Sequence, residues 1–406
     1  MTDAALIVDA ALRAADPYRN VYDAVSAISY DSAVTLVAVG KAAFTMAKAA
    51  YDVLGEKIKR GFVLTKYGHG DEPFSPVFTV REAGHPVPDV NSVKYTDEIL
   101  SAVKHLTEKD RLLFLVSGGA SALFESPLIE LDEMQQLTEF LLKCSADITE
   151  INTIRKRLSA VKGGRFAQMC PCRTDCIVLS DVLGDRLDII ASGPCFPDSS
   201  TTDDVRAILE KYNLPVDEKT KSLLMRETPS EVRDVNTVIA GNVVMLCSGA
   251  AKEAERLGYD VHIVTTQLTG EAAEKAKEIV ENAVLFSSLP HSKTAFIYGG
   301  ETTVTVKGSG MGGRNQEMAL TAAIALKNTE NITFVSLGSD GTDGPTDAAG
   351  GIADGTTYAK LLAENICPEA YLDDNNSYEA LKKADALLVT GPTGTNVNDI
   401  VIVLVN

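Results

Sequence analysis

The chain has 406 residues, and 38 Lys and Arg against 56 Asp and Glu give it a formal charge of −18 at neutral pH. This length is sufficient for two domains with buried cores, and the acidic balance excludes a general nucleic-acid binder, which needs a basic face to displace counterions from phosphates. No apolar run approaches the roughly 18 residues that span a bilayer, and the first residues lack the basic segment of a signal peptide, so we expect a cytoplasmic protein without a membrane partner.

The first half of the chain alternates between strand and helix patterns. Short β-branched or apolar runs predict strands at residues 34–39, 61–65, 77–81, 112–116 and 176–180. Helical spacing of apolar residues predicts helices at residues 3–15, 41–54, 90–105, 131–145, 153–168, 205–212 and 218–225. Strands that alternate with helices predict a Rossmann-like, mostly parallel α/β sheet with helices on both faces.

The second half repeats this alternation after a polar stretch at residues 214–236. Strands are predicted at residues 237–239, 260–265, 333–337, 385–389 and 400–405, a hairpin at 295–298 and 303–306, and helices at 242–257, 271–283 and 314–326. We therefore place a Rossmann-like α/β domain at residues 1–235 and a second α/β domain at residues 236–406. The sequence leaves open whether the final strands return to the sheet of the first domain.

The seven cysteines are an odd number in a long chain, which favours free thiols in a reducing compartment. Cys170, Cys172 and Cys176 are close in sequence. A zinc site would need a fourth ligand at a recognisable spacing, and no histidine is near. Chemically inactive thiols are therefore the favoured interpretation.

Polar, glycine-rich loops follow the ends of the predicted strands. They are Gly40-Lys41 and residues 117–121 (SGGAS), 180–185 (SDVLGD), 241–242 (GN), 299–301 (GGE), 338–344 (GSDGTDG) and 391–396 (GPTGTN). Open α/β sheets bind ligands beyond the carboxyl ends of their strands, and helix N-termini at that edge attract anions. Several such loops predict a site for phosphate or carboxylate groups.

Sequence motifs help to distinguish which phosphate-containing ligand the predicted site could bind. The chain lacks the G-x-x-x-x-G-K-[ST] sequence of a P-loop, whereas Gly308-Ser-Gly310-Met-Gly312-Gly313 matches the G-x-G-x-x-G pattern of dinucleotide binding. A lone match is weak evidence, and the strand before it is short and hairpin-like. A glycine loop around nucleotide phosphates, with Arg314 facing them, fits better, and nicotinamide binding stays as the alternative.

Several charged side chains lie in or beside these loops. Lys41 and Arg314 each stand at a predicted helix start, where a cation opposes the helix dipole, so anion binding is favoured over a solvated helix position. The strand-end loops also carry carboxylates, namely Asp181, Asp185, Glu301, Asp340 and Asp343. Carboxylates beside phosphates predict a bridging Mg²⁺ ion, although each of them could instead cap a helix or a turn.

Two further segments each allow two interpretations. Residues 81–89 (REAGHPVPD) follow a strand and are stiffened by Pro86 and Pro88, so His85 either contacts a small substrate or belongs only to a turn. The basic segment at residues 155–165, which begins with Arg155, is either a solvated helix face or a lining that attracts a carboxylate substrate.

A series of motifs extends in order over nearly the whole chain. They are VAVGKAA (37–43), EAGHPVPD (82–89), VSGGASAL (116–123), INTIRKRLSAVKGGRFA (151–167), LSDVLGD (179–185), IASGPCFPDSST (190–201), YGGETTV (298–304), GGRNQEMAL (312–320), GSDGTDGPTDAAGG (338–351) and TGPTGTNVND (390–399). At these residues the sequence resembles the glycerate 2-kinase family, the two-domain glycerate kinases with a MOFRL-type C-terminal domain. Cys195 departs from the family pattern, in which Thr is usual.

The resemblance implies ATP-dependent phosphorylation of D-glycerate at O2, giving 2-phosphoglycerate and ADP, with a divalent metal and an active site in the interdomain cleft. It also implies that the lysine and arginine important to the family are Lys41 and Arg314. Because members of the family are often labelled hydroxypyruvate reductases, an NAD(P)H-dependent hydroxypyruvate reductase is the alternative.

We therefore expect in-line transfer of the γ-phosphoryl group, with Lys41 and Arg314 neutralising charge and Asp181 accepting the hydroxyl proton. Replacing Lys41 or Arg314 with Ala is expected to remove most turnover from a folded protein. Substrate binding is assigned to Ser117, Gly118, Gly119, Ala120, Ser121, His85 and Arg155. ATP binding is assigned to Gly299, Gly300, Glu301, Gly310, Gly312, Gly313 and Asn315. Mg²⁺ binding is assigned to Asp181, Asp185, Glu301 and Asp340, and a homodimer is an open expectation.

Overall fold

The computed structural model describes residues 2–289 and 292–406, and these residues form two compact units. The first unit is Pro17–Ala240, and the second unit combines residues 2–16 with Gly241–Asn406. The second unit thus includes helix α1 (Asp3–Ala14), which the sequence had placed in the first domain. The helix packs along α11 (Val243–Arg256), and Gly249 permits this contact, because a Cβ there would come within 2.4 Å of the Cβ of Ala14.

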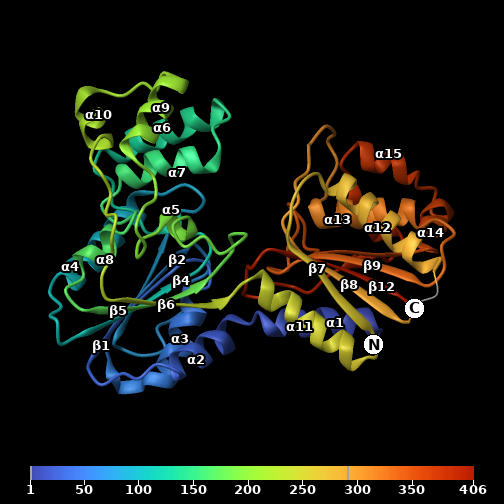
Figure 1. Cartoon of the computed structure of the whole chain (residues 1–406), viewed down its shortest axis with the longest axis horizontal. Coiled ribbons are helices and arrows are strands. Elements are labelled where there is room, and N and C mark those ends of the chain that lie inside the picture. Colours follow the sequence, from blue (N-terminus) through green and yellow to red (C-terminus); the bar gives the residue numbers. More distant parts are fainter. Residues whose placement is uncertain (1, 290–291) are drawn as a thin grey trace. The chain divides into compact units, whose positions relative to one another are not determined.

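The first unit is built on a sheet with the strand order β3-β2-β1-β4-β5-β6 (Figure 1). The strands are β1 (Val34–Val39), β2 (Ile58–Lys66), β3 (Phe78–Ala83), β4 (Arg111–Val116), β5 (Arg173–Leu179) and β6 (Val235–Gly241). The pairs β1–β2, β2–β3, β1–β4 and β4–β5 are parallel, which confirms the expected Rossmann-like, mostly parallel sheet.

Helices cover both faces of this sheet because the buried strands alternate their side chains between two cores. Val37 and Val39 of β1 join one core with α4 (Val90–Val103), α5 (Ala120–Leu123) and α8 (Arg165–Met169). Leu36 and Ala38 join the core on the other face, with α2 (Pro17–Ser26) and α3 (Ala43–Leu54).

A separate helical group lies at one end of the first unit (Figure 1). It consists of α6 (Leu131–Lys143), α7 (Ile148–Arg157), α9 (Thr202–Tyr212) and α10 (Glu218–Leu224), which share their own apolar cluster. The predicted continuous helix at residues 153–168 is wrong in extent, because α7 ends at Arg157 and α8 begins only at Arg165. Gly163 and Gly164 interrupt it with φ values of 57° and 83°, which a helix cannot accommodate.

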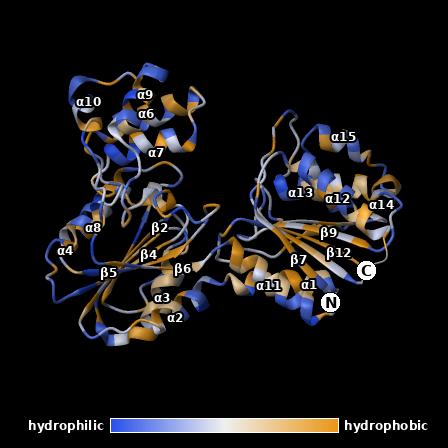
Figure 2. Cartoon of the chain, in the orientation of Figure 1, coloured by the Kyte–Doolittle hydropathy of each residue, from blue (hydrophilic) through white to orange (hydrophobic). Residues whose placement is uncertain are grey.

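The second unit contains a mixed sheet with the order β11-β10-β9-β12-β8-β7. The strands are β7 (Asp260–Leu268), β8 (Thr294–Gly300), β9 (Ile332–Gly338), β10 (Gly350–Asp354), β11 (Leu387–Leu388) and β12 (Asp399–Val405). The helices besides α1 and α11 are α12 (Ala272–Ser287), α13 (Arg314–Ala325), α14 (Thr357–Ala363), α15 (Pro368–Asp373) and α16 (Ser377–Lys383). Hydrophobic residues are concentrated in these strands (Figure 2).

The strand–helix alternation predicts mostly parallel pairing in this unit as well, and the sequence also predicted a hairpin; both expectations are wrong. β7 and β8 are parallel, but β12 is antiparallel to both of its neighbours, and β9–β10 and β10–β11 are antiparallel as well. The expected hairpin does not form, because β8 continues to Gly300 and Thr303 makes only an isolated bridge with Glu271. The final strands pair within this second sheet and do not return to the first.

The position of β12 gathers polar residues at one edge of the second sheet. β12 lies antiparallel between β8 and β9, so Asp399 at its start pairs with Gly300 and Gly338 at the ends of those strands. The polar loops that follow β8 and β9 therefore meet the first residues of β12.

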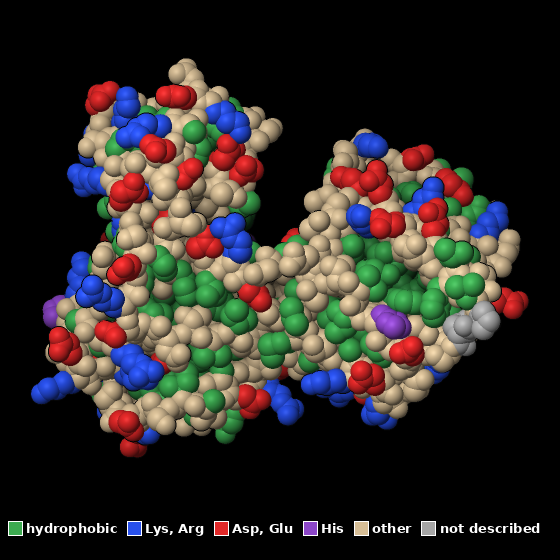
Figure 3. All heavy atoms as spheres, viewed as in Figure 1, with side chains coloured by type: hydrophobic (Ala, Val, Ile, Leu, Met, Phe, Trp, Pro, Cys, Tyr) green, Lys and Arg blue, Asp and Glu red, His purple; other side chains and the backbone are tan. Residues whose placement is uncertain are grey.

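On the face of each unit that Figure 3 shows, acidic and basic side chains are interspersed. Within residues 2–289 and 292–406, no helix has the length and apolar character needed to cross a membrane.

Candidate functional site

In the first unit, the predicted loops after β1 and β4 lie side by side. The strand order places β2 and β3 on one side of β1 and β4 to β6 on the other, so the order reverses between β1 and β4, where doubly wound sheets bind ligands. The Lys41 amide donates to the carbonyl of Gly118 over 2.9 Å. The Ala42 amide donates to Ser117 Oγ over 3.1 Å, so the two loops are joined directly.

Two glycines make this approach possible. Gly40 has a φ of 125°, and a Cβ on it would lie 2.2 Å from Ser117 Oγ. Gly119 has a φ of 85°, and its Cβ position would lie 3.0 Å from His85 Nε2 and 3.3 Å from Lys41 Cγ. The predicted residues Lys41, His85 and Gly119 therefore lie close together. Glycine is required at positions 40 and 119 because both have a positive φ and leave no room for a Cβ.

The imidazole of His85 is held neutral. Burial first, and then the positive charges of Lys41, Lys66 and His69, lower the pKa of His85 to about 4. Burial and neighbouring lysines also lower the pKa of His69. Lys66 is the last residue of β2 and His69 follows it in the motif KYGHG; neither was predicted as a site residue, although their place at a strand end was a signal that could have identified them.

The lowered pKa of His85 predicts a loss of stability at acidic pH. In the unfolded chain His85 binds a proton below about pH 6.5, whereas the folded protein binds it only near pH 4, so acidification between these values favours unfolding. We expect His85→Asn to reduce the fall in unfolding free energy between pH 7 and pH 5 by about 1 kcal/mol, less than the full shift because His85 is only half-buried. Urea denaturation of both proteins at the two pH values measures this, and parallel pH profiles would contradict it.

The basic segment is mostly buried, so the solvated-face interpretation is wrong for most of it. Lys156 pairs with Asp198 at 3.0 Å, and Lys162 pairs with the fully buried Glu125 at 2.5 Å. Arg157 and Arg165 donate to backbone carbonyl groups. These cations therefore hold loops of the first unit together.

Arg155 is the member of this segment that reaches the predicted substrate loop. Its guanidinium donates to the backbone carbonyl of Ser121 over 3.1 Å, and it lies 4.0 Å from the carboxylate of Glu125. Within that loop the amides of Ser117 and Ala120 donate to Val39 and Ser117 carbonyl groups. Those two amides would have to give up these bonds to bind a substrate carboxylate.

Asp181 and Asp185 lie in the loop that follows β5, the strand beside β4. Parallel strands end at the same edge of a sheet, so this loop belongs to the same edge as Lys41 and Ser117. Asp185 has a left-handed φ of 52°, a conformation that Asp tolerates better than most residues.

In the second unit, Arg314 is the centre of an ion-pair cluster. Its guanidinium binds Asp399 through two nitrogen atoms at 2.5 and 3.0 Å and binds Glu301 at 2.6 Å. Asn398 Nδ2 donates to the second oxygen of Glu301 over 3.1 Å. Asp399 was not predicted as a site residue, although it ends the motif TGPTGTNVND; its partners became visible only with the antiparallel placement of β12.

Asp343 explains how a helix can begin with an arginine. Its carboxylate accepts hydrogen bonds from the amides of Asn315 and Gln316 at the start of α13, which satisfies the free N–H groups and offsets the dipole there. Asn315 is buried and donates from its side chain to Asp343, while its Oδ1 accepts from Ser336. The predicted nucleotide-binding Asn315 thus contributes to the fold of this edge.

The carboxylates at this edge differ in their environment. Burial raises the pKa of Asp399 to about 6, against the opposing effect of Arg314. Burial also raises the pKa of Asp343. Asp340 is half-buried and accepts from Thr342, and a Cβ on Gly338 would lie within 3.5 Å of oxygens of both Asp340 and Asp399. Asp340 and Asp399 therefore face the same turn.

The glycines predicted to bind nucleotide are closely packed. A Cβ on Gly310 or Gly312 would approach Asn376 or Ser377 within 2.3 Å, and one on Gly313 would lie 2.4 Å from Asp343. The Gly310 amide donates to the Asp374 carbonyl over 2.9 Å. A Cβ on Gly299 would collide with Val243 and Cys247 of α11, and one on Gly300 with the backbone of Leu268. Close packing is thus one reason for glycine at each of these positions.

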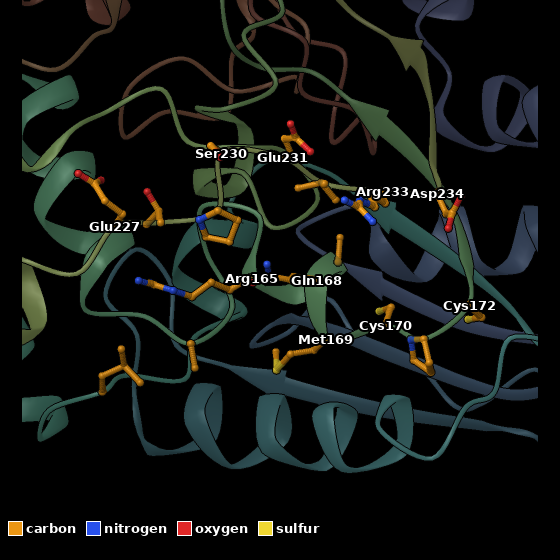
Figure 4. A pocket seen from close by; sticks show the side chains of 17 residues that line it. Arg165, Gln168, Met169, Cys170, Cys172, Glu227, Ser230, Glu231, Arg233 and Asp234 are labelled. Carbon is orange, nitrogen blue, oxygen red and sulfur yellow. The ribbon is translucent and has the colours of Figure 1, made fainter.

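An open cavity of about 850 Å³ lies in the first unit (Figure 4). It is lined by residues that include Arg165, Met169, Cys170, Glu231 and Arg233. Arg165 is engaged by backbone carbonyl groups of Lys156 and Ser159, and burial raises the pKa of Cys170 to about 12. Each of the seven cysteines is a free thiol, and the residues that line this cavity do not include Lys41, His85 or residues 117–121.

Comparison with known proteins identifies the family. Two family models match the chain: a domain of unknown function, DUF4147, over residues 3–225 and the MOFRL family over residues 294–399. A D-glycerate 2-kinase from Thermotoga maritima is 52% identical over 405 residues, covering 98% of this chain and 97% of the relative. A glycerate 2-kinase from Pyrococcus horikoshii is 43% identical over 432 residues, covering 98% and 96%.

A solved structure agrees with this match. The crystal structure of a glycerate kinase from Thermotoga maritima has a TM-score of 0.96 at 51% identity and covers 100% of this chain and 99% of that chain. The chain therefore belongs to the glycerate 2-kinase family with a MOFRL-type C-terminal domain.

Proposed function

We propose that the protein transfers the γ-phosphoryl group of ATP to O2 of D-glycerate, producing 2-phosphoglycerate and ADP. The observation that carries this proposal is the 52% identity to a D-glycerate 2-kinase over 98% of the chain. The loops around Lys41 and Arg314 supply the cationic and polar groups that recognition of a small carboxylate and of phosphates requires.

In this reaction, the bond between the γ-phosphorus and the oxygen bridging to the β-phosphate breaks, and a bond between that phosphorus and O2 forms. We assign to Lys41 the neutralisation of charge on the transferring group, because its ammonium has no side-chain partner among the described residues. Arg314 acts on phosphate charge together with its carboxylate partners, and Asp181 accepts the proton of the hydroxyl group.

His85, Arg155 and residues 117–121 are assigned to D-glycerate, because they converge around Gly119 and Ser121. A neutral imidazole at His85 can donate one hydrogen bond and accept another, which suits a hydroxy acid. The glycine-rich segments at Gly299–Glu301 and Gly310–Asn315 remain predictions for nucleotide binding.

Mg²⁺ remains a proposal. Among residues 2–289 and 292–406, no group of three or more His, Cys, Asp or Glu side chains is arranged to hold a metal ion. Mg²⁺ bound with nucleotides commonly uses only one or two carboxylates and takes its other oxygens from phosphates and water. Asp340 and Glu301 fit such a role in the second unit, and Asp181 and Asp185 in the first. The ion would neutralise phosphate charge.

One assay tests the proposed function. Purified protein with D-glycerate, ATP and Mg²⁺ is expected to release ADP and form 2-phosphoglycerate, identified by its NMR spectrum. Omitting Mg²⁺ is expected to abolish product formation. Formation of 3-phosphoglycerate would overturn the position of transfer. Oxidation of NAD(P)H with hydroxypyruvate, without an ATP requirement, would support the reductase instead. The expected homodimer is tested by sedimentation of the same sample.

A further inference from the structure

A left-handed backbone turn lies against the substrate loop of the first unit. Ala191, Ser192 and Gly193 have successive φ values of 53°, 60° and 65°. Residues with a Cβ rarely adopt this conformation, and its occurrence where the surroundings hold it in place points to a functional constraint. The carbonyl groups of Ser192 and Gly193 accept hydrogen bonds from the amides of Gly163 and Gly164 over 3.0 and 2.7 Å.

The turn directs the Ser192 hydroxyl into a chain of hydrogen bonds. Ser192 Oγ donates to Asn152 Oδ1 over 3.2 Å, and it lies 2.7 Å from Ser121 Oγ. A hydroxyl group has a single proton. Because the proton of Ser192 is given to Asn152, the hydrogen bond between the two serines must be donated by Ser121. The Ser121 hydroxyl therefore presents only acceptor lone pairs on its remaining side.

Ser121 is also fixed through its backbone. Its carbonyl accepts from Arg155 over 3.1 Å. Ser192 and Asn152 are buried, whereas Ser121 is only half-buried, so the chain leads from the interior to an accessible oxygen. The accessible end belongs to the same SGGAS loop as Gly119, which contacts Lys41 and His85.

We propose that Ser121 Oγ accepts a hydrogen bond from the hydroxyl group of the substrate that is not phosphorylated, and that Ser192 and Asn152 are positioning residues for it. An oxygen that can only accept does not pair with a carboxylate, which also only accepts, and selects an O–H donor. The inference rests on the proposed function. If O2 of D-glycerate receives the phosphoryl group, its primary hydroxyl is the donor, and the substrate class is a short 2,3-dihydroxy acid.

The test compares D-glycerate with D-lactate, which is the same acid without the primary hydroxyl. The ratio of kcat/KM for D-glycerate to kcat/KM for D-lactate is measured by ADP release. Ser121→Ala is expected to lower this ratio about tenfold, because one neutral hydrogen bond is lost for D-glycerate alone. Ser192→Ala is expected to lower the same ratio, because the Ser121 proton is then free to turn outward. Ser101→Ala, an exposed serine of α4, is the matched control and leaves the ratio unchanged.

The outcomes separate the two proposals. An unchanged ratio in a folded Ser121→Ala protein that still phosphorylates D-glycerate would overturn this inference and leave the proposed function standing. An equal loss on both substrates in Ser192→Ala would overturn its positioning role. If Ser192→Ala does not fold, Ser121→Ala decides by itself. If the wild-type protein does not phosphorylate D-glycerate, both proposals fall.

Discussion

Replacing Lys41 with Ala is expected to lower kcat/KM for phosphorylation of D-glycerate at least about a hundredfold while leaving the melting temperature nearly unchanged. Loss of one preorganised charged group aimed at the transferring phosphoryl costs about this much. The fold does not depend on the side chain, because the contact that Lys41 makes with the β4 loop is donated by its backbone amide. Steady-state kinetics with both substrates and thermal denaturation check the prediction.

The control is Lys48→Ala, in helix α3, which begins at Ala43 shortly after Lys41. Lys48 is exposed and pairs with Asp52 at 3.3 Å, so its removal is expected to change neither turnover nor stability appreciably. Turnover of Lys41→Ala at the level of Lys48→Ala would remove Lys41 from the chemistry.

Replacing Arg314 with Ala is expected to destabilise the protein by about 3 kcal/mol. The sequence predicted a folded protein that has lost most of its turnover, but Arg314 is the partner of Asp399, whose side chain is 8% exposed. Removing the guanidinium leaves a buried carboxylate without its counter-charge, and breaking a buried pair from one side costs roughly 3–5 kcal/mol. We take the lower end because the Arg314 side chain is 35% exposed. Urea denaturation measures the change.

A second substitution separates the lost ion pair from a lost catalytic group. Asp399→Asn in the Arg314→Ala background removes the unpaired charge and is expected to recover much of the stability but none of the turnover. Arg256→Ala is the matched control, because its pair with Glu253 is exposed and contributes little. If Arg314→Ala is as stable as Arg256→Ala, the cluster does not stabilise the fold.

The local pattern of apolar and turn residues was sufficient to predict many of the strands and loops of the first unit. The buried strands of β1 and β4 could be recognised because side chains on both faces are apolar, and the glycine-rich loops could be placed because turn residues follow strand ends. The resemblance to the glycerate 2-kinase family rested on motifs spread over the whole chain, which is why the comparisons confirmed it.

Pairing between distant segments was decided only by the tertiary structure. Whether two strands of the second sheet pair in a parallel or an antiparallel manner depends on which strands are neighbours. Local periodicity of the sequence does not show which strands will be neighbours. Consequently Asp399 was missed as the partner of Arg314. The basic segment showed the same limitation: its charges were visible, but their burial against Asp198 and Glu125, 42 and 37 residues away, depends on long-range contacts.

Composition and spacing thus predicted which residues could bind the substrates. They did not predict which of these residues donate or accept hydrogen bonds, or which charged side chains form ion pairs. Ser121 could be named from its loop, but its acceptor-only character follows from Ser192, 71 residues further along the chain. Hydrogen bonds and ion pairs act over a few ångströms in space, and the folded backbone alone determines which side chains come within that range.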